Sequence, residues 1–305
     1  MSWTRDDMPS LSGQTWVVTG ANAGLGLATV KALAKRGARV VLACRDAGRA
    51  AGAEAEVRGE VPDAALEVRP LDVSSLASVE SFSHALHGAY GRLDGLINNA
   101  GIMAVPRSLS ADGFELQLAT NHLGHFALTS RLLPLLERAP AARVVVVGSI
   151  AHRSGDIVFG DLHGERAYSP WRAYAQSKLA NLLFAYEAAR RFGALGLRTR
   201  VLAAHPGYTR TGLLNVDSAL GRFFRFGTFI SQPAADGALP QLYAATAPEA
   251  EAGGYYGPSG WFELKGAPVR VASSRRSRDA ALAARLWEVS ESLTGARFTP
   301  PTASA

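Results

Sequence analysis

The chain has 305 residues, of which 48% are hydrophobic and 19% are charged. These proportions describe a globular protein with a sizeable core and exclude a disordered or fibrous chain. The net charge is +6 at pH 7, but the cations are dispersed rather than gathered in a block, so we expect no nucleic-acid partner. No apolar stretch is long enough to span a bilayer, which predicts no transmembrane segment.

Cysteine usage bears on the redox compartment. Cys44 is the only cysteine in the sequence. A single cysteine allows neither an intrachain disulfide nor a cysteine metal cluster, which is typical of proteins in a reducing cytosol. The first residues are polar and lack the apolar region of a signal peptide or hydrophobic anchor. We therefore expect a cytoplasmic protein.

Short apolar and β-branched runs alternate with helical stretches along the chain. We expect strands at residues 14–19, 39–44, 66–71, 93–97, 143–148 and 198–203. We expect helices from the glycine-rich turn to about residue 36, then at 46–59, from 74 or 75 to 90, and at 111–138 and 171–192. Gly37 is expected to end the first helix and Asp46 to cap the second.

This alternation predicts the fold class. Strands that alternate with helices at short loop length predict an α/β protein with a doubly wound parallel sheet of Rossmann type, about seven strands and helices on both faces. No linker or repeat divides the sequence, so we expect residues 1–305 to form one domain. The ends, about 1–11 and 299–305, are expected to fray.

The turn after the first strand reads Thr19-Gly20-Ala21-Asn22-Ala23-Gly24-Leu25-Gly26. Glycines there let the backbone turn sharply and approach a pyrophosphate, which then lies at the N-terminus of the following helix. The spacing is G-x-x-x-G-x-G rather than G-x-G-x-x-G. Its place between the first strand and the first helix nevertheless favours dinucleotide binding.

The end of the second strand bears on the choice of dinucleotide. NAD-binding sites usually place a carboxylate there, whereas this strand is followed by Arg45, a cation that suits the 2′-phosphate of NADP. Asp46 is the alternative ribose carboxylate, although its position also suits a helix cap. We expect NADP(H) in preference to NAD(H).

Tyr174 and Lys178 stand four residues apart, a spacing that places both side chains on one face of a helix. An ammonium group near a phenol favours the phenolate, so we expect Lys178 to lower the pKa of Tyr174. A tyrosine tuned in this way exchanges a proton with an alcohol or carbonyl oxygen. The alternative is a solvated helix face, and the rarity of lysine among the 32 cations favours the chemical role.

Taken in order, these motifs resemble the short-chain dehydrogenase/reductase family over roughly residues 11–212. The matching residues are the glycine-rich turn, Asp72-Val73, Asn98-Asn99-Ala100-Gly101, Asn121, Ser149, Tyr174, Lys178, and Pro206-Gly207 with Thr211. Finer matches are similar to its retinol dehydrogenase and protochlorophyllide reductase-like branch, which mostly uses NADP(H). They are Ala43-Cys44-Arg45-Asp46, Ser149-Ile150-Ala151-His152, Tyr174-Ala175-Gln176-Ser177-Lys178-Leu179-Ala180-Asn181, His205-Pro206-Gly207, and the insertion between Ser149 and Tyr174 with Gly155-Asp156-Ile157 and Asp161-Leu162.

The resemblance implies a catalytic set of Asn121, Ser149, Tyr174 and Lys178. Tyr174 would exchange the proton with the substrate oxygen, and Ser149 would hydrogen-bond that oxygen. Lys178 would also bind the nicotinamide ribose, and Asn121 would hold a water that links Lys178 to solvent. A loop cap for Ser149 and an ordinary helix position for Asn121 are the alternatives.

The resemblance also implies a cofactor-binding set, and the absence of ligand spacing predicts no metal site. The cofactor-binding residues would be Gly20, Asn22, Ala23, Gly24, Leu25, Gly26, Arg45, Asp72, Val73, Asn98, Ala100, Gly101, Tyr174, Lys178, Pro206, Gly207, Thr209 and Thr211. The remaining polar candidates lack ligand spacing, and we interpret them as packing or loop residues. They are His122, His125, His152, His205, Asp94 and Asp161.

Residues 207–232 are expected to form the substrate loop. Its apolar side chains at 213–230 favour a lid over a lipophilic substrate, with core packing or a subunit contact as alternatives. We therefore expect an NADP(H)-dependent oxidoreductase that interconverts an alcohol and a carbonyl in a small molecule, and we leave open assembly as a homo-oligomer. One alternative is a catalytically silent NADP-binding regulatory or scaffold protein. The other, a nucleotide-sugar epimerase, is disfavoured because the T-G-x-x-G-x-x-G spacing is absent.

Overall fold

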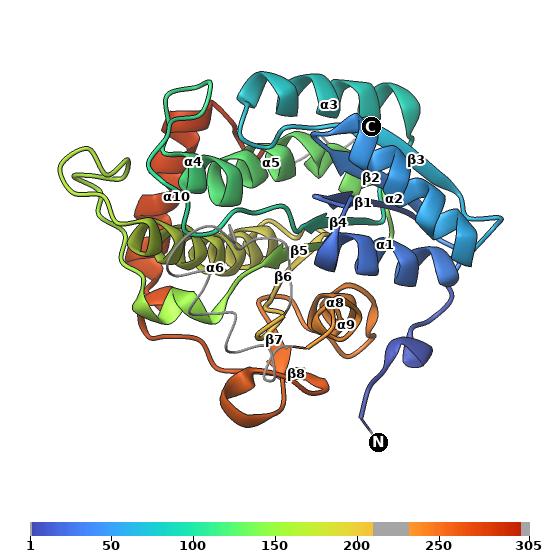
Figure 1. The fold of residues 1–305 in the computed structure, drawn as a ribbon. Coiled ribbons are helices and arrows are strands. Elements are labelled where there is room, and N and C mark those ends of the chain that lie inside the picture. The colour runs from blue at the N-terminus through green and yellow to red at the C-terminus, as the bar shows by residue number, and fades with distance from the viewer. Residues whose placement is uncertain (1, 210–231, 300–305) are drawn as a thin grey trace.

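A computed structural model describes residues 2–209 and 232–299 of the chain, and all of its strands belong to one sheet (Figure 1). The strands are β1 (Thr15–Thr19), β2 (Arg39–Cys44), β3 (Leu66–Pro70), β4 (Gly95–Asn98), β5 (Arg143–Val147), β6 (Arg200–Ala204), β7 (Tyr255–Pro258) and β8 (Pro268–Arg270). Their order is β3-β2-β1-β4-β5-β6-β7-β8, and every neighbouring pair is parallel except β7 and β8. The Rossmann-type α/β fold is confirmed, with one strand more than the seven expected.

The strands form where the sequence predicts them. Strand β2 has the predicted bounds, and the other five predicted strands begin and end within two residues of their expected limits. All five residues of β5 are buried, and so are the last five residues of β2. Continuous burial of this kind follows from helices that cover both faces of a parallel sheet.

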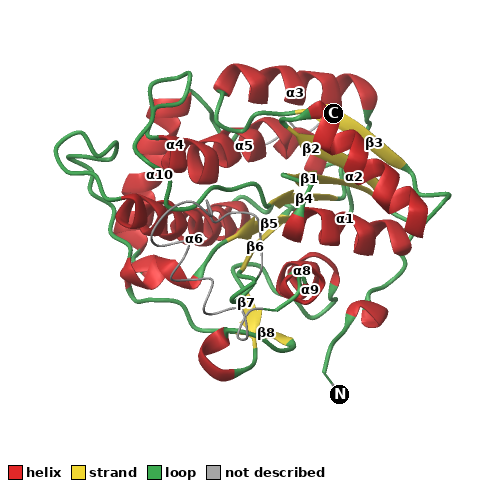
Figure 2. Ribbon diagram, in the orientation of Figure 1, coloured by secondary structure: helices red, strands yellow, loops and turns green. Residues whose placement is uncertain are grey.

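Helices flank the sheet on both faces (Figure 2). The α-helices are α1 (Gly24–Lys35), α2 (Ala47–Glu60), α3 (Leu76–Ala89), α4 (Leu116–Leu118), α5 (Gly124–Leu136), α6 (Pro170–Ala194), α8 (Ala234–Gly237), α9 (Leu239–Thr246) and α10 (Ala280–Thr294). Short 3-10 helices occur at η1 (Arg5–Asp7), η3 (Ile150–Ser154), η5 (Trp261–Glu263) and η6 (Arg276–Arg278), and a π-helical turn occurs at η2 (Ala119–Leu123).

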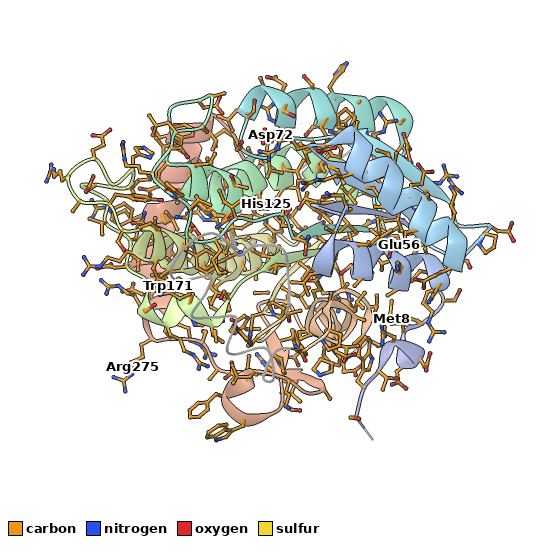
Figure 3. All side chains as sticks on the ribbon, viewed as in Figure 1. Met8, Glu56, Asp72, His125, Trp171 and Arg275 are labelled. Carbon is orange, nitrogen blue, oxygen red and sulfur yellow. The ribbon has the colours of Figure 1, made fainter. Side chains whose placement is uncertain are left out.

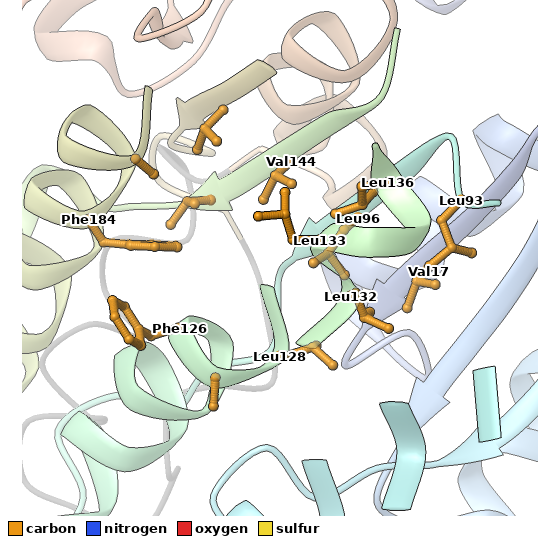
Figure 4. Packing of buried hydrophobic residues seen from close by; sticks show 14 of the residues in the cluster. Val17, Leu93, Leu96, Phe126, Leu128, Leu132, Leu133, Leu136, Val144 and Phe184 are labelled. Carbon is orange, nitrogen blue, oxygen red and sulfur yellow. The ribbon is translucent and has the colours of Figure 1, made fainter. Parts of the chain in front are cut away.

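Each face of the sheet has its own hydrophobic cluster. One lies under α3, α5 and α6 and includes Phe126, Phe184 and Trp287, whereas the other lies under α1, α2 and α9. Figure 4 shows Phe126 and Phe184 turned toward each other, with ring centres 5.4 Å apart. Through Trp287, the C-terminal helix α10 also packs against α6 and α5, which fixes the position of α6 beside the sheet.

Local signals set the ends of several helices as predicted. Gly37 follows α1 with a φ of 86°, a left-handed conformation that ends a helix at little cost for glycine. The carboxylate of Asp46 accepts a hydrogen bond from the amide of Arg49, so this residue is the N-cap of α2. The carboxylates of Asp94 and Asp161, which are not at helix ends, also accept hydrogen bonds from backbone amides, those of Thr15 and Glu165.

The helix predicted at residues 111–138 is wrong in its first part. Residues 109 and 115 pair as an isolated antiparallel bridge, and the carboxylate of Glu115 caps a helix that begins only at Leu116. The helix then passes through the π turn η2 before continuing as α5. Gly124 ends that turn directly against the carbonyl of Val73, where a β-carbon would collide. Asn121 therefore lies in a π turn instead of a regular helix.

The N-terminal residues expected to fray are packed in part. Thr4 and Asp7 cap each other's backbone around η1. Met8 and Leu11 bury their side chains in the cluster under α1 and α9. Residues 300–305 lie outside the described part of the chain.

Candidate active site

The site candidates gather at the edge of the sheet where the central parallel strands end. Thr19, Asn98 and Val147 are the last residues of β1, β4 and β5, and these strands are neighbours in the sheet. Parallel strands present their carboxyl ends at one edge, and in open α/β sheets ligands bind there. The helix α6 packs against β5 and β6 and carries Tyr174 and Lys178.

Lys178 is held by the end of β5. Its Nζ donates to the carbonyl oxygen of Val147 over 3.1 Å, and the side-chain amide of Asn181 donates to the same oxygen over 3.1 Å. Lys178 is only 5% exposed, and burial lowers its pKa to about 8. Its ammonium nitrogen lies 5.8 Å from the centre of the Tyr174 ring.

The side chains of Tyr174 and Ser149 interact with each other. Ser149 follows β5 and caps η3, because its hydroxyl accepts the amide of Ala151 over 3.2 Å. The ring of Tyr174 is buried and lies 5.6 Å from the ring of Trp171, which Figure 3 labels at the start of α6. The serine therefore fills both the loop-cap position and the position beside the tyrosine.

Asn121 joins the π turn to the segment after β4 and to α6. Its side chain accepts the amide of Ile102 over 2.9 Å and donates to the carbonyl of Ile102 over 3.0 Å. It also donates to the hydroxyl of Ser177 over 2.8 Å. A β-carbon added to Gly101 would lie 3.1 Å from Asn121 Oδ1 and 3.6 Å from Lys178 Nζ. The structure thus brings the four predicted catalytic residues to one place.

The glycine-rich turn adopts the conformation its sequence requires. Gly20 and Gly24 have φ angles of 63° and 53°, and a β-carbon on Gly26 would collide with the carbonyl of Gly20. The residue at the N-cap of α1 is Ala23, which has no side-chain acceptor to cover the first amides of the helix. Uncapped amides at a helix N-terminus form an anion-binding site. Asn22 lies in the same turn, and Leu25 is the second residue of α1.

The second predicted anion contact is at the end of β2. Arg45 is exposed, and its guanidinium lies 3.9 Å from the carboxylate of Asp72. Asp72 itself accepts hydrogen bonds from the amide and hydroxyl of Ser74, while Val73 is buried. The cation therefore faces solvent beside the glycine-rich turn, as a 2′-phosphate contact would require, whereas Asp46 is occupied as a cap.

The segments after β4 and β6 complete the edge. The side-chain amide of Asn98 donates to Thr129 over 2.9 Å, and Ala100 donates its own amide to the hydroxyl of Thr19 over 2.9 Å. Thr209 donates its hydroxyl to the carbonyl of Pro206 over 2.9 Å, and Gly207 has a φ of 67°. Thr211 and the apolar residues 213–230 of the expected lid lie outside the described residues.

Comparison with known proteins identifies the family. The family model for short chain dehydrogenase matches residues 14–219. The chain belongs to the short-chain dehydrogenase family. Human retinol dehydrogenase 12 is 41% identical over 290 residues, which cover 94% of this chain and 88% of the relative. Human retinol dehydrogenase 14 is 39% identical, and the match covers 93% of this chain and 87% of the relative. Within the family, the chain is thus of the retinol dehydrogenase-like branch.

Two solved structures share the fold of this chain. The crystal structure of an uncharacterized protein from Mycobacterium Paratuberculosis is 44% identical, with a TM-score of 0.83, and covers 98% of this chain and 100% of that one. The RhlG/NADP active-site complex of Pseudomonas aeruginosa is 25% identical, with a TM-score of 0.65, and covers 81% and 94%.

The direction of the Tyr174 pKa shift in this short-chain dehydrogenase differs from the one expected from the sequence. Lys178 was expected to lower the pKa of Tyr174, but burial raises that pKa, and the opposing influence comes from the hydrogen bond to Ser149. A buried phenol loses the hydration that would stabilise its anion, so the neutral form is favoured in the protein alone. The prediction is therefore wrong for the protein without a ligand.

Four histidines interpreted as packing or loop residues are indeed buried, yet each has a defined polar partner. His122 bonds Ser290, His125 bonds Thr19, and His152 bonds the carbonyl of Ser149. His205 accepts the amide of Gly207 over 3.2 Å, and its Nε2 lies 2.9 Å from Glu263. In residues 2–209 and 232–299, no three His, Cys, Asp or Glu side chains converge as a metal site would require. The same part of the chain contains no helix that is both long and apolar enough to cross a membrane.

Sequence reasoning missed two contributors to this site. Asn181 shares the Val147 carbonyl with Lys178, and its place seven residues after Tyr174, two helical turns along α6, was the available signal. Glu263 joins His205 and Arg153 across the segment after β6, and its φ of 57° is unusual for a residue with a side chain. No local pattern marks Glu263, because its partners are distant in sequence.

Proposed function

We propose that this short-chain dehydrogenase is an NADP(H)-dependent oxidoreductase that interconverts an alcohol and a carbonyl, with Tyr174 as the general acid and base. The observation that carries the proposal is the buried contact of Tyr174 with Ser149, beside Lys178 and at the same sheet edge as the glycine-rich turn. That edge is where a proton donor and a bound dinucleotide would meet. The RhlG/NADP complex, a solved relative, supports the choice of cofactor.

The residues present fit a dinucleotide. Gly20 and Gly24 adopt left-handed conformations that let the backbone approach a pyrophosphate, and the uncapped start of α1 would receive its charge. Arg45 would bind the 2′-phosphate with charge-assisted hydrogen bonds. Lys178 lies against Gly101 at the opposite end of the site, where it would bind the nicotinamide ribose. When bound, the nicotinamide supplies or accepts the hydride.

The chain's own side chains would handle the proton. In the reductive direction the Tyr174 hydroxyl would donate to the substrate oxygen, and Ser149 would hydrogen-bond the negative charge as it develops. The burial that raises the Tyr174 pKa keeps this hydroxyl protonated and ready to donate. Lys178 is buried, and this burial lowers its pKa. Because solvent screens a buried charge little, the Lys178 ammonium would act strongly on nearby groups.

The retinol dehydrogenase names of the relatives support a lipophilic substrate, as does the apolar sequence at 213–230. A turnover screen with NADPH and NADH against lipophilic aldehydes, ketones and alcohols would test the proposal, following absorbance of the reduced nicotinamide. We expect turnover with NADPH. Measurable NADPH binding without turnover of any substrate would favour a cofactor-binding regulatory protein instead.

Cytoplasmic residence, a single-domain organisation and homo-oligomer formation stay predictions. Fractionation of the cells that produce the protein would test the first. Limited proteolysis would test the second, because a single domain yields no stable internal fragment. Light scattering of the purified protein would test the third.

A further inference from the structure

His125 is a buried imidazole that connects two parts of the site. Its Nε2 lies 2.9 Å from the hydroxyl oxygen of Thr19, and its Nδ1 lies 3.1 Å from the carbonyl oxygen of Asn121. Thr19 ends β1, whereas Asn121 lies in the π turn η2, so the ring bridges the glycine-rich turn and the proposed catalytic residues. The side chain is 1% exposed, and Figure 3 shows it in the interior of the molecule.

The partners of His125 determine which nitrogen carries the hydrogen. A carbonyl oxygen only accepts, so Nδ1–H donates to Asn121 and Nε2 is left as an acceptor for the Thr19 hydroxyl. Burial lowers the pKa of His125 to about 4, so the ring is neutral at pH 7. The hydroxyl hydrogen of Thr19 is therefore directed at His125.

This direction leaves both lone pairs of Thr19 free to accept. They receive the backbone amides of Asn99 and Ala100, each over 2.9 Å. The other acceptor near the Thr19 hydroxyl is the carbonyl of Ile97, which is farther away at 3.3 Å and shares the Asn99 amide with Thr19. His125 is thus the better acceptor for the hydroxyl hydrogen.

Residues 99–102 are consequently held at both ends. Thr19 holds the amides of Asn99 and Ala100, and the side chain of Asn121 holds both backbone polar groups of Ile102. His125 is bonded to both of these residues. Between the two anchors lies Gly101, the residue that faces Lys178.

We propose that His125 is a positioning residue that orients the Thr19 hydroxyl and thereby holds residues 99–102 in place for the cofactor. The inference rests on the proposed function and deepens it, because it assigns a role to a buried residue outside the proposed catalytic and cofactor-binding sets. It requires the Nε2 acceptor in particular, whereas a purely structural role would require only a buried side chain of similar size.

Two substitutions separate the ring nitrogens. An asparagine amide reaches about as far as Nδ1, so His125→Asn keeps a donor toward Asn121 but loses the acceptor for Thr19. A glutamine amide reaches about as far as Nε2, so His125→Gln keeps an acceptor for Thr19. His122→Asn is the matched control, because His122 is equally buried one turn earlier but bonds Ser290 of α10.

The readout that needs no cofactor is amide hydrogen exchange in the peptide that contains Asn99 and Ala100. We expect exchange there to be about five- to tenfold faster in His125→Asn, because losing the net stabilisation of one hydrogen bond changes the opening equilibrium by about that factor. Exchange should be unchanged in His125→Gln and His122→Asn. The dissociation constant of NADPH should rise by a similar factor in His125→Asn alone. Equal exchange in His125→Asn and His122→Asn would overturn the inference.

Thr19→Val provides a second test, and as a single variant it does not depend on the folding of the histidine variants. Alone, it should speed exchange at the same two amides. The double variant with His125→Asn should add nothing further, because both changes remove one linked set of bonds. Additive effects would overturn the inference. If the unaltered protein fails to bind NADPH, the proposed function fails, while the exchange measurements still decide the role of His125.

Discussion

The ammonium nitrogen of Lys178 lies 5.8 Å from the centre of the Tyr174 ring, and both groups are buried. Burial penalises each charged form, so it raises the pKa of Tyr174 and lowers that of Lys178 to about 8. Burial therefore favours the neutral phenol of Tyr174. A bound ligand would have to supply any stabilisation of the phenolate.

Tyr174→Phe should lower kcat by at least about a hundredfold, because it removes the proton donor without changing the shape of the ring. The dissociation constant of NADPH should change little, since the hydroxyl is assigned to the substrate oxygen. Initial rates and a fluorescence titration with NADPH measure the two quantities. Tyr243→Phe, on the remote helix α9, is the control, and substantial residual turnover in Tyr174→Phe would refute the role of Tyr174.

Arg45→Ala should weaken NADPH binding by about tenfold or more while leaving NADH binding nearly unchanged, because only NADPH carries the 2′-phosphate. Parallel titrations with the two cofactors give the ratio. Arg49→Ala is a matched control, since this nearby exposed cation is paired with Asp46. An equal loss for NADH and NADPH would show that Arg45 does not recognise the phosphate.

Lys178→Met should stabilise the protein without cofactor at pH 7 while it abolishes turnover. The folded pKa of Lys178 is about 8 and the ordinary value is 10.5, so folding at pH 7 places a buried charge in an unfavourable environment. Removing that charge should raise the free energy of unfolding by up to about 3 kcal/mol. Asn181 remains to bond the Val147 carbonyl.

The pH dependence of Lys178→Met has a definite sign. Between about pH 8 and the ordinary pKa the unfolded chain binds the extra proton, so the unaltered protein gains stability as pH rises and the variant does not. Urea unfolding across this range should show the difference between the two proteins shrinking. A variant less stable than the unaltered protein at pH 7 contradicts the prediction.

His122 should make the protein sensitive to acid. Burial lowers its pKa from 6.5 to about 3, so its contribution to stability is complete above pH 6.5 and is lost progressively as pH falls toward 3. By pH 5 the loss should be about 2 kcal/mol. His122→Phe should lose correspondingly less between pH 7 and pH 5 in urea unfolding, and equal losses in the two proteins would count against this role.

Trp287→Ala should destabilise the fold by about 3–5 kcal/mol, because it leaves a cavity where α10 packs against α5 and α6. The indole is 3% exposed, and its ring lies 5.1 Å from Phe126 and 4.5 Å from Phe298. Chemical denaturation measures the change. Trp261→Ala is the control, since that side chain is 82% exposed and should contribute little. Similar losses in the two variants would contradict the packing argument.

Much of the fold could be predicted because the signals were local. The run Arg39–Cys44 reads as a buried strand from its own side chains, and the strand has those bounds. The helix around Asn121 was predicted less well, since the π turn depends on the contact of Gly124 with Val73, which lies about fifty residues earlier. Local periodicity cannot encode such a contact.

By itself, the sequence determined the strand and helix order, the conformation of the glycine-rich turn and the spacing of Tyr174 and Lys178, because each depends on neighbouring residues. The tertiary structure alone decided which groups share a proton or a hydrogen bond. Thr19 and His125 are 106 residues apart in the chain, and Lys178 meets a carbonyl 31 residues away. It also reversed the expected pKa shift of Tyr174, because burial is a property of the packed molecule and not of a motif.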